Sequence, residues 1–221
     1  MAPKSRSYQH SATPFVIFAQ LLAIAVTTIV FVLYLHFEGG FAFKSKDKTK
    51  IFNVHPFLMV LGLIIIGGEA IMAYKIVPGG RRTQKGVHLI LHLLALTARI
   101  LGIVFIFRYH NEVGDKDMQT LHSWLGIITI SLYGLQWLLA FFAYCFPGAE
   151  MSRRATLLPW HTFFGMVIFL LAVATALTGL SGFCHELSTR GFISNFTGLL
   201  IDPFICNHCY PHCYPSSRLL S

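Results

Sequence analysis

Five long apolar segments constrain this chain more than any other feature of its sequence. They cover residues 15–35, 55–74, 86–107, 122–146 and 156–180. A helix that crosses the hydrocarbon core of a bilayer needs about 20 such residues. The whole chain is 55% hydrophobic and only 12% charged, which is too apolar for an ordinary soluble domain of 221 residues. The sequence therefore predicts an all-α fold, namely a polytopic membrane helix bundle.

The net charge of +8 gathers in the connections between these segments. If the N-terminus is cytoplasmic, the cytoplasmic segments hold eight basic residues, which are Lys4, Arg6, Lys75, Arg81, Arg82, Lys85, Arg153 and Arg154. The opposite loops hold six, which are Lys44, Lys46, Lys48, Lys50, Arg108 and Lys116. The positive-inside rule counts Lys and Arg in this way and favours a cytoplasmic N-terminus, although the four lysines of 44–50 are discordant. Because this charge is typical of insertion topology and no nucleic-acid-binding module is recognisable, we expect no nucleic acid partner.

The first apolar segment lacks the short core and small-residue cleavage site of a signal peptide. It is predicted to be a retained helix, which makes the protein a multi-pass integral membrane protein. We expect a cytoplasmic tail over residues 1–14, a transmembrane bundle over 15–180 and a separate C-terminal segment over 181–221.

Each of the last four apolar segments begins with a histidine, namely His55, His88, His122 and His161. Because successive helices run in opposite directions, His55 and His122 fall near the non-cytoplasmic face, and His88 and His161 near the cytoplasmic face. Ionisable residues inside membrane helices are costly and usually functional, and a haem iron can take two axial imidazoles. One histidine at a helix end is more often an interfacial residue, but four in antiparallel register favour axial ligation. The sequence predicts two haem b groups between the second to fifth helices, with roughly 20 Å between their irons.

Other residues near these histidines are candidates for haem contacts. Gly126, Gly165 and Gly62 lie four or seven residues after a predicted ligand, where small residues leave room for a porphyrin. His92, one turn after the histidine that opens its segment, is expected beside a haem or its propionates. Arg99 is expected near the level of the non-cytoplasmic haem, where a propionate or a backbone carbonyl can accept its hydrogen bonds.

Several motifs together resemble one known family. FNVHPFLMVLGLIIIGGEAIMAYK, LHSWLG and LPWHTFFG are similar to segments of the eukaryotic cytochrome b561 family, and of its plant type in particular. The resemblance covers roughly residues 15–198 and implies a six-helix membrane oxidoreductase with two haem b groups in its central four helices. Such proteins pass electrons from cytosolic ascorbate to monodehydroascorbate or a ferric chelate on the other side. The resemblance also implies a vacuolar, other endomembrane or plasma membrane location and a homodimer.

The resemblance further implies where the substrates bind. The cytoplasmic ascorbate site is implied to be a group of basic residues, namely Arg81, Lys85, Arg154, Lys75 and Arg153. The acceptor on the opposite face is implied to bind at Tyr109 and His110. A cationic mouth would attract the ascorbate monoanion, although from the residues alone the same charges could be a topology signal only. No catalytic residue is expected beyond the haems.

The C-terminal segment departs from the family pattern. Residues 195–201 look like the start of the sixth helix, but Asp202 and Pro203 interrupt the apolar run, so only a partial sixth helix is expected. A tract of cysteine and histidine follows, made of Cys206, His208, Cys209, His212 and Cys213. Such tracts can bind zinc, although a sequence without an evolved role is the favoured interpretation.

Transmembrane electron transfer from ascorbate is the main functional prediction. The alternative is a non-catalytic truncated form that acts as a partner or regulator of full-length family members. An ascorbate-reducible b-type haem in membranes that contain the chain would separate the two.

Overall fold

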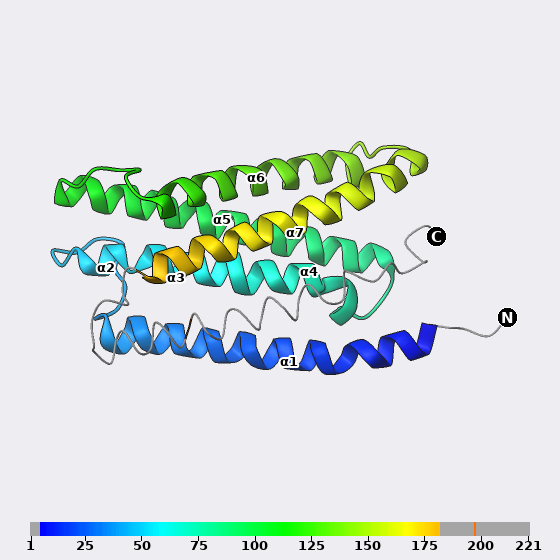
Figure 1. The fold of residues 1–221 in the computed structure, drawn as a ribbon, viewed down its shortest axis with the longest axis horizontal. Coiled ribbons are helices and arrows are strands. Elements are labelled where there is room, and N and C mark those ends of the chain that lie inside the picture. The colour runs from blue at the N-terminus through cyan, green and yellow to red at the C-terminus, as the bar shows by residue number, and fades with distance from the viewer. Residues whose placement is uncertain (1–4, 182–196, 198–221) are drawn as a thin grey trace.

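The computed structural model of the chain describes residues 5–181 and Thr197. Within these residues the fold is helical without β-strands, and the helices run along one long axis (Figure 1). Five stretches are long and apolar enough to cross a membrane, namely Pro14–Phe37, Thr49–Ile76, Arg81–Val113, Leu121–Tyr144 and Met151–Leu180. The predicted fold class, an all-α multi-pass bundle, is confirmed. The predicted partial sixth helix and the Cys/His tract lie outside the described residues.

Two of these stretches are composed of more than one helical element. The first is α1 (Ser5–Val32), which continues into the π-helical η1 (Leu33–Phe37). The second consists of α2 (Thr49–Phe52), α3 (Val54–Met59), the π-helical η2 (Val60–Ile66) and α4 (Gly67–Ile76). The remaining three are α5 (Arg81–Val113), α6 (Leu121–Tyr144) and α7 (Met151–Ser181).

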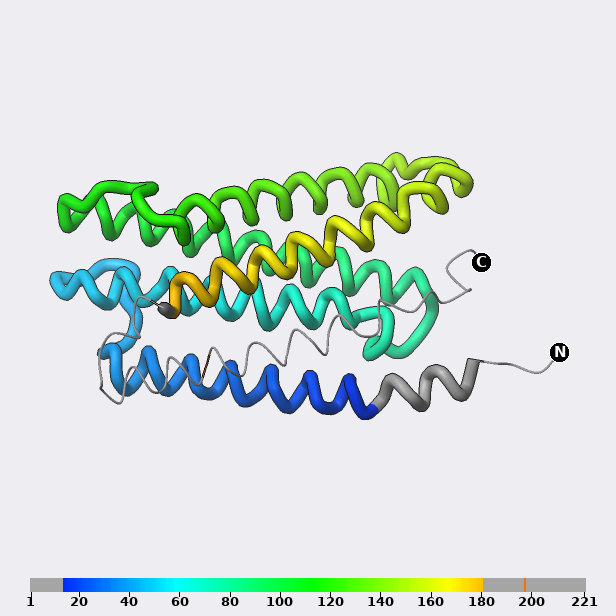
Figure 2. Tube along the Cα trace, viewed as in Figure 1, coloured from blue at the N-terminus to red at the C-terminus, as the bar shows by residue number. Residues whose placement is uncertain are grey.

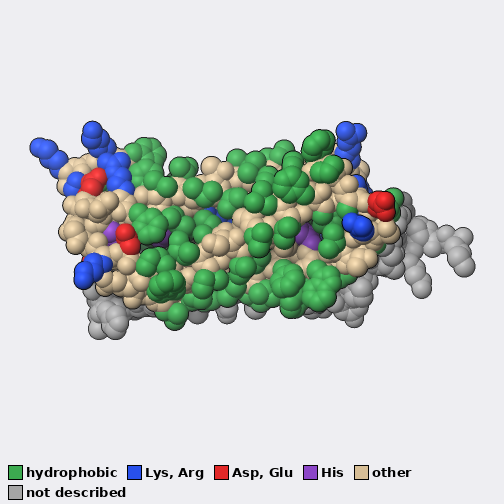
Figure 3. Space-filling model, turned by 90° about the horizontal axis from the view of Figure 1, so that it is seen from above, with side chains coloured by type: hydrophobic (Ala, Val, Ile, Leu, Met, Phe, Trp, Pro, Cys, Tyr) green, Lys and Arg blue, Asp and Glu red, His purple; other side chains and the backbone are tan. Residues whose placement is uncertain are grey.

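The surface of the bundle is divided as a membrane requires. In Figure 3, basic and acidic side chains gather at the two ends, and hydrophobic side chains cover the length between them. Large apolar residues such as Ile24, Leu139 and Trp160 are exposed on different helices. A belt of this kind is stable where lipid chains cover it, so the protein is a multi-pass integral membrane protein.

Two helical hairpins form the central part of the bundle. The first hairpin joins the α2–α4 stretch to α5, and the second joins α6 to α7 (Figure 2). Helix α1 packs on the outside, where Val26 meets Ile64 of η2 and Ala172 of α7 in a buried apolar cluster. The side-chain amide of Gln20 also donates to both carboxylate oxygens of Glu69, at 2.9 and 2.8 Å, and links α1 to α4.

The connections that precede α3 and α6 are fixed by local hydrogen bonds. Asn53, which is almost fully buried, donates from Nδ2 to the carbonyl oxygens of Glu38 and Gly40, both at 2.9 Å. Helix α5 ends at Gly114, whose φ of +78° suits a residue without a side chain. Thr120 then caps α6, because its hydroxyl oxygen accepts from the backbone N–H of Ser123 at 3.2 Å. These turns place the first residues of the second and fourth membrane stretches.

Gly62 brings the two helices of the first hairpin into close contact. A Cβ atom at this position would lie 2.8 Å from Cβ of Ala98 and 3.2 Å from the carbonyl oxygen of Ala95. Gly62 was expected to leave room for a porphyrin, but it lies at the interface with α5 instead.

Substitution of Gly62 by alanine should therefore force η2 away from α5, because both close neighbours are rigid. We expect a loss of about 1–3 kcal/mol in stability, seen as a lower denaturation temperature of the purified protein in detergent. Gly134→Ala is the matched control, since its Cβ would lie 3.9 Å from the nearest atom, Cδ1 of Leu96. Equal denaturation temperatures for the two variants would contradict the close packing.

Candidate functional site

Four histidines form two facing pairs inside the bundle. His55 of α3 faces His122 of α6 with 6.2 Å between ring centroids and 86° between ring planes. His88 of α5 faces His161 of α7 with 6.2 Å between centroids and 71° between planes. Each pair takes one histidine from the first hairpin and one from the second, so both pairs lie between the hairpins.

Three of these rings are held by a backbone carbonyl on the neighbouring helix of the same hairpin. Nδ1 of His55 lies 3.0 Å from the carbonyl oxygen of Gly102. The corresponding distances are 2.8 Å from His88 to Ala70 and 2.9 Å from His122 to Thr175. A carbonyl oxygen can only accept, so Nδ1 carries the hydrogen and Nε2 of the neutral ring keeps a free lone pair. This is the arrangement that orients metal-binding histidines in proteins.

His161 is held by a side chain instead of the backbone. The amide of Gln136 lies 3.0 Å from Nδ1 of His161 and also contacts the carbonyl oxygen of the same residue at 2.7 Å. Nε2 of Gln136 donates to that carbonyl oxygen, so the same amide nitrogen lies against Nδ1 of His161 and fixes the position of the ring. A Cβ at Gly165 would be in ordinary van der Waals contact with this amide, at 3.6 Å.

The two pairs lie at different depths in the bundle. On α5, Gly102 follows His88 by fourteen residues, and on α7, Thr175 follows His161 by fourteen residues. At 1.5 Å per residue, both helices separate the two levels by about 21 Å. This agrees with the spacing expected from the sequence.

The second membrane stretch reaches the same two levels with one more residue. Ala70, which accepts from His88, follows His55 by fifteen positions, and the π-helical η2 lies between them. A π-helix has wider turns than an α-helix and so accommodates an additional residue. The π-helical segment therefore keeps His55 at the level of Gly102 and Ala70 at the level of His88 on α5.

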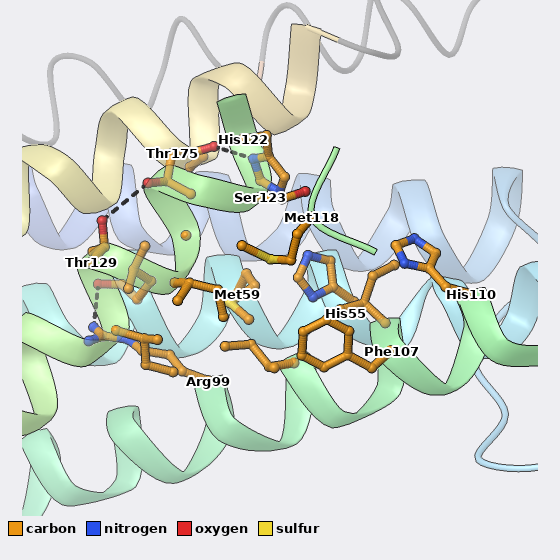
Figure 4. A pocket seen from close by; sticks show the side chains of 17 residues that line it. His55, Met59, Arg99, Phe107, His110, Met118, His122, Ser123, Thr129 and Thr175 are labelled. Carbon is orange, nitrogen blue, oxygen red and sulfur yellow. Dashed lines mark hydrogen bonds between the residues drawn. The ribbon is translucent and has the colours of Figure 1, made fainter. Parts of the chain in front are cut away.

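An elongated cavity runs beside the His55–His122 pair (Figure 4). Its walls are mainly apolar side chains of α3, η2, α5, α6 and α7, and Gly126 is among the lining residues, as predicted. His110 lies toward one end of the cavity in Figure 4, whereas Arg99 and Thr129 lie at the other. No aspartate or glutamate among the described residues lines it.

This geometry fits a haem with two axial histidines. A nitrogen–metal bond of about 2.0–2.1 Å on each side, plus half an imidazole ring, places the two ring centroids about 6 Å apart. Both pairs have this separation. The apolar cavity beside one pair and the hydrogen-bonded Nδ1 atoms add the space and the orientation that such a group needs.

Gly179 is a residue of this site that the sequence analysis missed. A Cβ atom at Gly179 would lie 2.7 Å from Cε1 and 3.1 Å from Nδ1 of His122. The glycine therefore leaves the space that the imidazole fills. It stands one turn after Thr175 on α7, a position that becomes informative only once α6 and α7 are known to be neighbours.

His92 lies beside the cytoplasmic pair. Its ring centroid is 4.4 Å from that of His88, and its Nδ1 forms a hydrogen bond with the hydroxyl of Tyr133. His88 is the residue of α5 whose ring faces His161.

Arg99 is almost completely buried at the inner end of the cavity. Its guanidinium carbon lies 3.5 Å from the centroid of the Tyr133 ring, and Nη2 donates to the carbonyl oxygen of Leu63 at 3.3 Å. It lies between the levels of the two histidine pairs and nearer to the His55–His122 pair, whose cavity it lines.

Lys85 and the backbone of Arg154, two of the predicted ascorbate residues, lie near Tyr144 at one end of the bundle. Lys85 donates from Nζ to the carbonyl oxygen of Tyr144 at 3.0 Å, and the Tyr144 hydroxyl donates to the carbonyl oxygen of Arg154 at 3.4 Å. The ring of Tyr144 lies 5.6 Å from that of His161. The sequence analysis did not single out Tyr144, because its proximity depends on how the ends of α5, α6 and α7 meet.

The other predicted basic residues are at the same end of the bundle. Arg81 lies over the ring of Tyr74 at 5.9 Å, and that ring is 5.3 Å from His88. Lys75 is in the last turn of α4, and Arg153 is exposed in the first turn of α7.

Of the two predicted acceptor residues, only His110 lines the cavity. Its Nδ1 contacts a carboxylate oxygen of Asp117 at 2.6 Å. The neighbouring Tyr109 packs against Phe52, with 5.2 Å between ring centroids. The structure therefore places His110, rather than Tyr109, beside the His55–His122 pair.

Comparison with known proteins identifies similar sequences. Residues 54–185 match the family model described as eukaryotic cytochrome b561. The chain is 46% identical over 202 residues to probable ascorbate-specific transmembrane electron transporter 1 of Oryza sativa subsp. japonica, covering 87% of this chain and 86% of the relative. It is 40% identical over 190 residues to transmembrane ascorbate ferrireductase 1 of Arabidopsis thaliana, covering 82% and 80%. It is 38% identical over 212 residues to the transmembrane ascorbate-dependent reductase CYB561 of Ovis aries, covering 91% and 83%.

Alanine at position 179 should disturb the non-cytoplasmic pair selectively. Its Cβ would collide with the His122 ring, so the ring must rotate or move away from His55. We expect purified Gly179→Ala protein to retain less haem per chain than wild type when its haem content is measured by absorbance. Gly134→Ala, whose added Cβ would make only ordinary van der Waals contact, at 3.9 Å from Cδ1 of Leu96, should retain the wild-type content. Normal haem content in Gly179→Ala would argue against a ligand role for His122.

Proposed function

We propose, since the chain belongs to the eukaryotic cytochrome b561 family, that it is a transmembrane oxidoreductase that takes electrons from cytosolic ascorbate. Proteins of this family bind haem, and the names of its relatives as ascorbate-dependent electron transporters and reductases support ascorbate as the donor. The observation that carries the proposal is the presence of two facing histidine pairs at two depths of one bundle.

We propose two haem b groups, one for each pair. His55 and His122 would hold the non-cytoplasmic haem, and His88 and His161 the cytoplasmic one, while His92 and Arg99 lie beside the two sites. Haem supplies a one-electron carrier when it is bound. Because two histidines would hold each haem, the protein's part would be to keep two electron carriers within reach of each other and of their substrates.

The cytoplasmic substrate site would lie where Lys85 and Arg154 meet at Tyr144. Ascorbate is a monoanion at neutral pH, so the Lys85 ammonium and the Arg154 guanidinium at this end of the bundle would attract it toward the His88–His161 pair. Arg81, Lys75 and Arg153 increase the positive potential at the same end without a direct role in the contact.

The acceptor would be reduced beside His110, at the outer end of the cavity. Monodehydroascorbate or a ferric chelate could approach this end from the non-cytoplasmic side. The side chain of His110 is held by Asp117, so it can offer a hydrogen bond to such an acceptor from a fixed position. Tyr109 supports it by packing against Phe52.

The first test is a reduced-minus-oxidised spectrum of membranes that contain the full chain, recorded after addition of ascorbate. We expect the bands of a b-type haem, and histidine substitutions should remove them in two sets. His55→Ala or His122→Ala should remove one haem, and His88→Ala or His161→Ala the other, because each pair shares one iron.

The two sets should differ in their response to ascorbate. Variants that keep the cytoplasmic pair should still be reduced by ascorbate added to the cytoplasmic side. Loss of the same haem from variants of both sets would overturn the pairing. A wild-type spectrum without any ascorbate-reducible haem would leave only the non-catalytic partner as a function.

Neutralising the cytoplasmic cations should slow reduction by ascorbate. We expect Lys85→Ala and Arg154→Ala to lower the second-order rate about tenfold in stopped-flow measurements, and to weaken its dependence on ionic strength. Lys116→Ala is the matched control, because it removes a basic residue from the loop at the opposite end. A similar loss of rate in all three variants would indicate a general charge effect and contradict a local binding site.

A further inference from the structure

Arg99 places a positive charge deep inside the membrane bundle. Its side chain is 1% exposed, and a guanidinium remains protonated in proteins. Arg99 follows His88 by about 16 Å along α5 and precedes Gly102, the residue that holds His55, by about 5 Å. The charge therefore lies between the levels of the two histidine pairs and closer to the non-cytoplasmic one.

No carboxylate within the described residues balances this charge. The described membrane stretches contain two acidic side chains, and Glu69 accepts from Gln20 while Glu112 pairs with Lys48 and Arg108. The Nε and Nη1 atoms of Arg99 are buried and form no hydrogen bond with the described residues. A buried cation without a counter-ion is costly, and such residues in membrane proteins are usually functional.

The surroundings of Arg99 hold the guanidinium in place without neutralising it. Tyr133 offers the face of its ring, and the carbonyl oxygen of Leu63 accepts from Nη2. Gly67 leaves the necessary space, because a Cβ there would lie 3.1 Å from Nη2. These contacts contribute partial charges only, so the full positive charge faces the inner end of the cavity.

We propose that Arg99 raises the reduction potential of the haem held by His55 and His122, an inference that rests on the proposed function. Reduction of ferric to ferrous iron adds one electron and no proton, so the site becomes less positive by one charge. A fixed cation at the inner end of the cavity stabilises the reduced form, and the low dielectric of the bundle strengthens this interaction. Arg99 thereby favours movement of an electron from the cytoplasmic haem, which ascorbate reduces, to the non-cytoplasmic haem.

A role as anchor for a haem carboxylate is the competing explanation. The outer end of the cavity carries His110 and Ser123, where carboxylates are hydrated more easily than at the buried inner end. With the carboxylates at the outer end, Arg99 would lie beside an apolar edge of the haem. The two explanations differ in what charge removal does, since an anchor mainly affects haem retention and an unbalanced charge mainly affects the potential.

Redox titration of the purified haem-loaded full chain, followed by visible absorbance, tests the proposal. We expect Arg99→Gln to lower the potential of one haem by at least about 59 mV, which is a tenfold change in the equilibrium constant for electron exchange between the haems. Arg99→Lys, which keeps the charge, should shift it by less than half as much. Thr97→Val is the matched control, because it removes a polar but uncharged group from the exposed face of the same helix, and the potential of this haem should stay at the wild-type value.

The affected haem can be assigned in a His161→Ala background, where only the haem of the other pair remains. An unchanged potential in Arg99→Gln, or equal shifts in the glutamine and lysine variants, would overturn the proposal. Loss of this haem from Arg99→Gln together with its retention in Arg99→Lys would also overturn the proposal, because it would show that Arg99 anchors a haem carboxylate. If the haems are reduced by ascorbate but their potentials do not change in the Arg99 variants, only this inference is wrong. If the wild-type chain holds no haem, the proposed function is wrong as well.

Discussion

The hydrogen bond from Nδ1 of a histidine to the neighbouring helix is the interaction on which the rest of this bundle depends. It fixes the tautomer, and it turns Nε2 away from its own hairpin and toward the other one. Three rings are held in this way and the fourth, His161, by the amide of Gln136, so every ring is oriented by a residue of its own hairpin. A shared iron at each level would then join the hairpins, so cofactor binding and helix association would stabilise each other.

The same bonds explain why the helix geometry has to be exact over a long distance. Each of the four central membrane stretches contributes a ring at one level and a hydrogen-bonding group for a neighbouring ring at the other, which is a carbonyl oxygen in three of them and the Gln136 amide in α6. A shift of one residue would rotate this group by 100° away from its ring. The additional residue between His55 and Ala70 would cause such a shift, and the π-helical η2 absorbs it. Gly62 lies within this segment, where the wider turns bring the backbone close to Ala98.

The sequence was sufficient for the features that follow from one-dimensional patterns. Five apolar segments gave the fold class, and the alternating direction of the helices gave the two levels of His55, His88, His122 and His161. Their pairing could be predicted because it requires only topology. Their separation could be predicted because an α-helix has a fixed rise per residue.

The features that the sequence analysis missed depend on contacts between helices. Gly179 matters because α7 lies against the ring of His122, and Tyr144 because it meets Lys85 and Arg154 where three helix ends converge. Gln136 resembled any polar residue of a membrane helix until its amide was found at Nδ1 of His161. Gly62 was assigned to the wrong neighbour for the same reason. Helical periodicity predicts which residues share a face of a helix, but not which helix or cofactor packs against that face.

Arg99 shows how a costly residue can be tolerated in such a bundle. Its carbonyl and aromatic contacts stabilise the guanidinium by less than a carboxylate would. The positive charge is therefore only partly compensated, and a positive electrostatic potential remains inside the cavity. A carboxylate partner would make the apoprotein more stable but would cancel that potential. A bundle that has to move an electron inward from an anionic donor benefits from a fixed positive charge beyond the first carrier. Under the proposed role of Arg99, the stability of the apoprotein and the direction of electron transfer are in conflict at this position, and the cavity, which no described aspartate or glutamate lines, favours the direction of transfer.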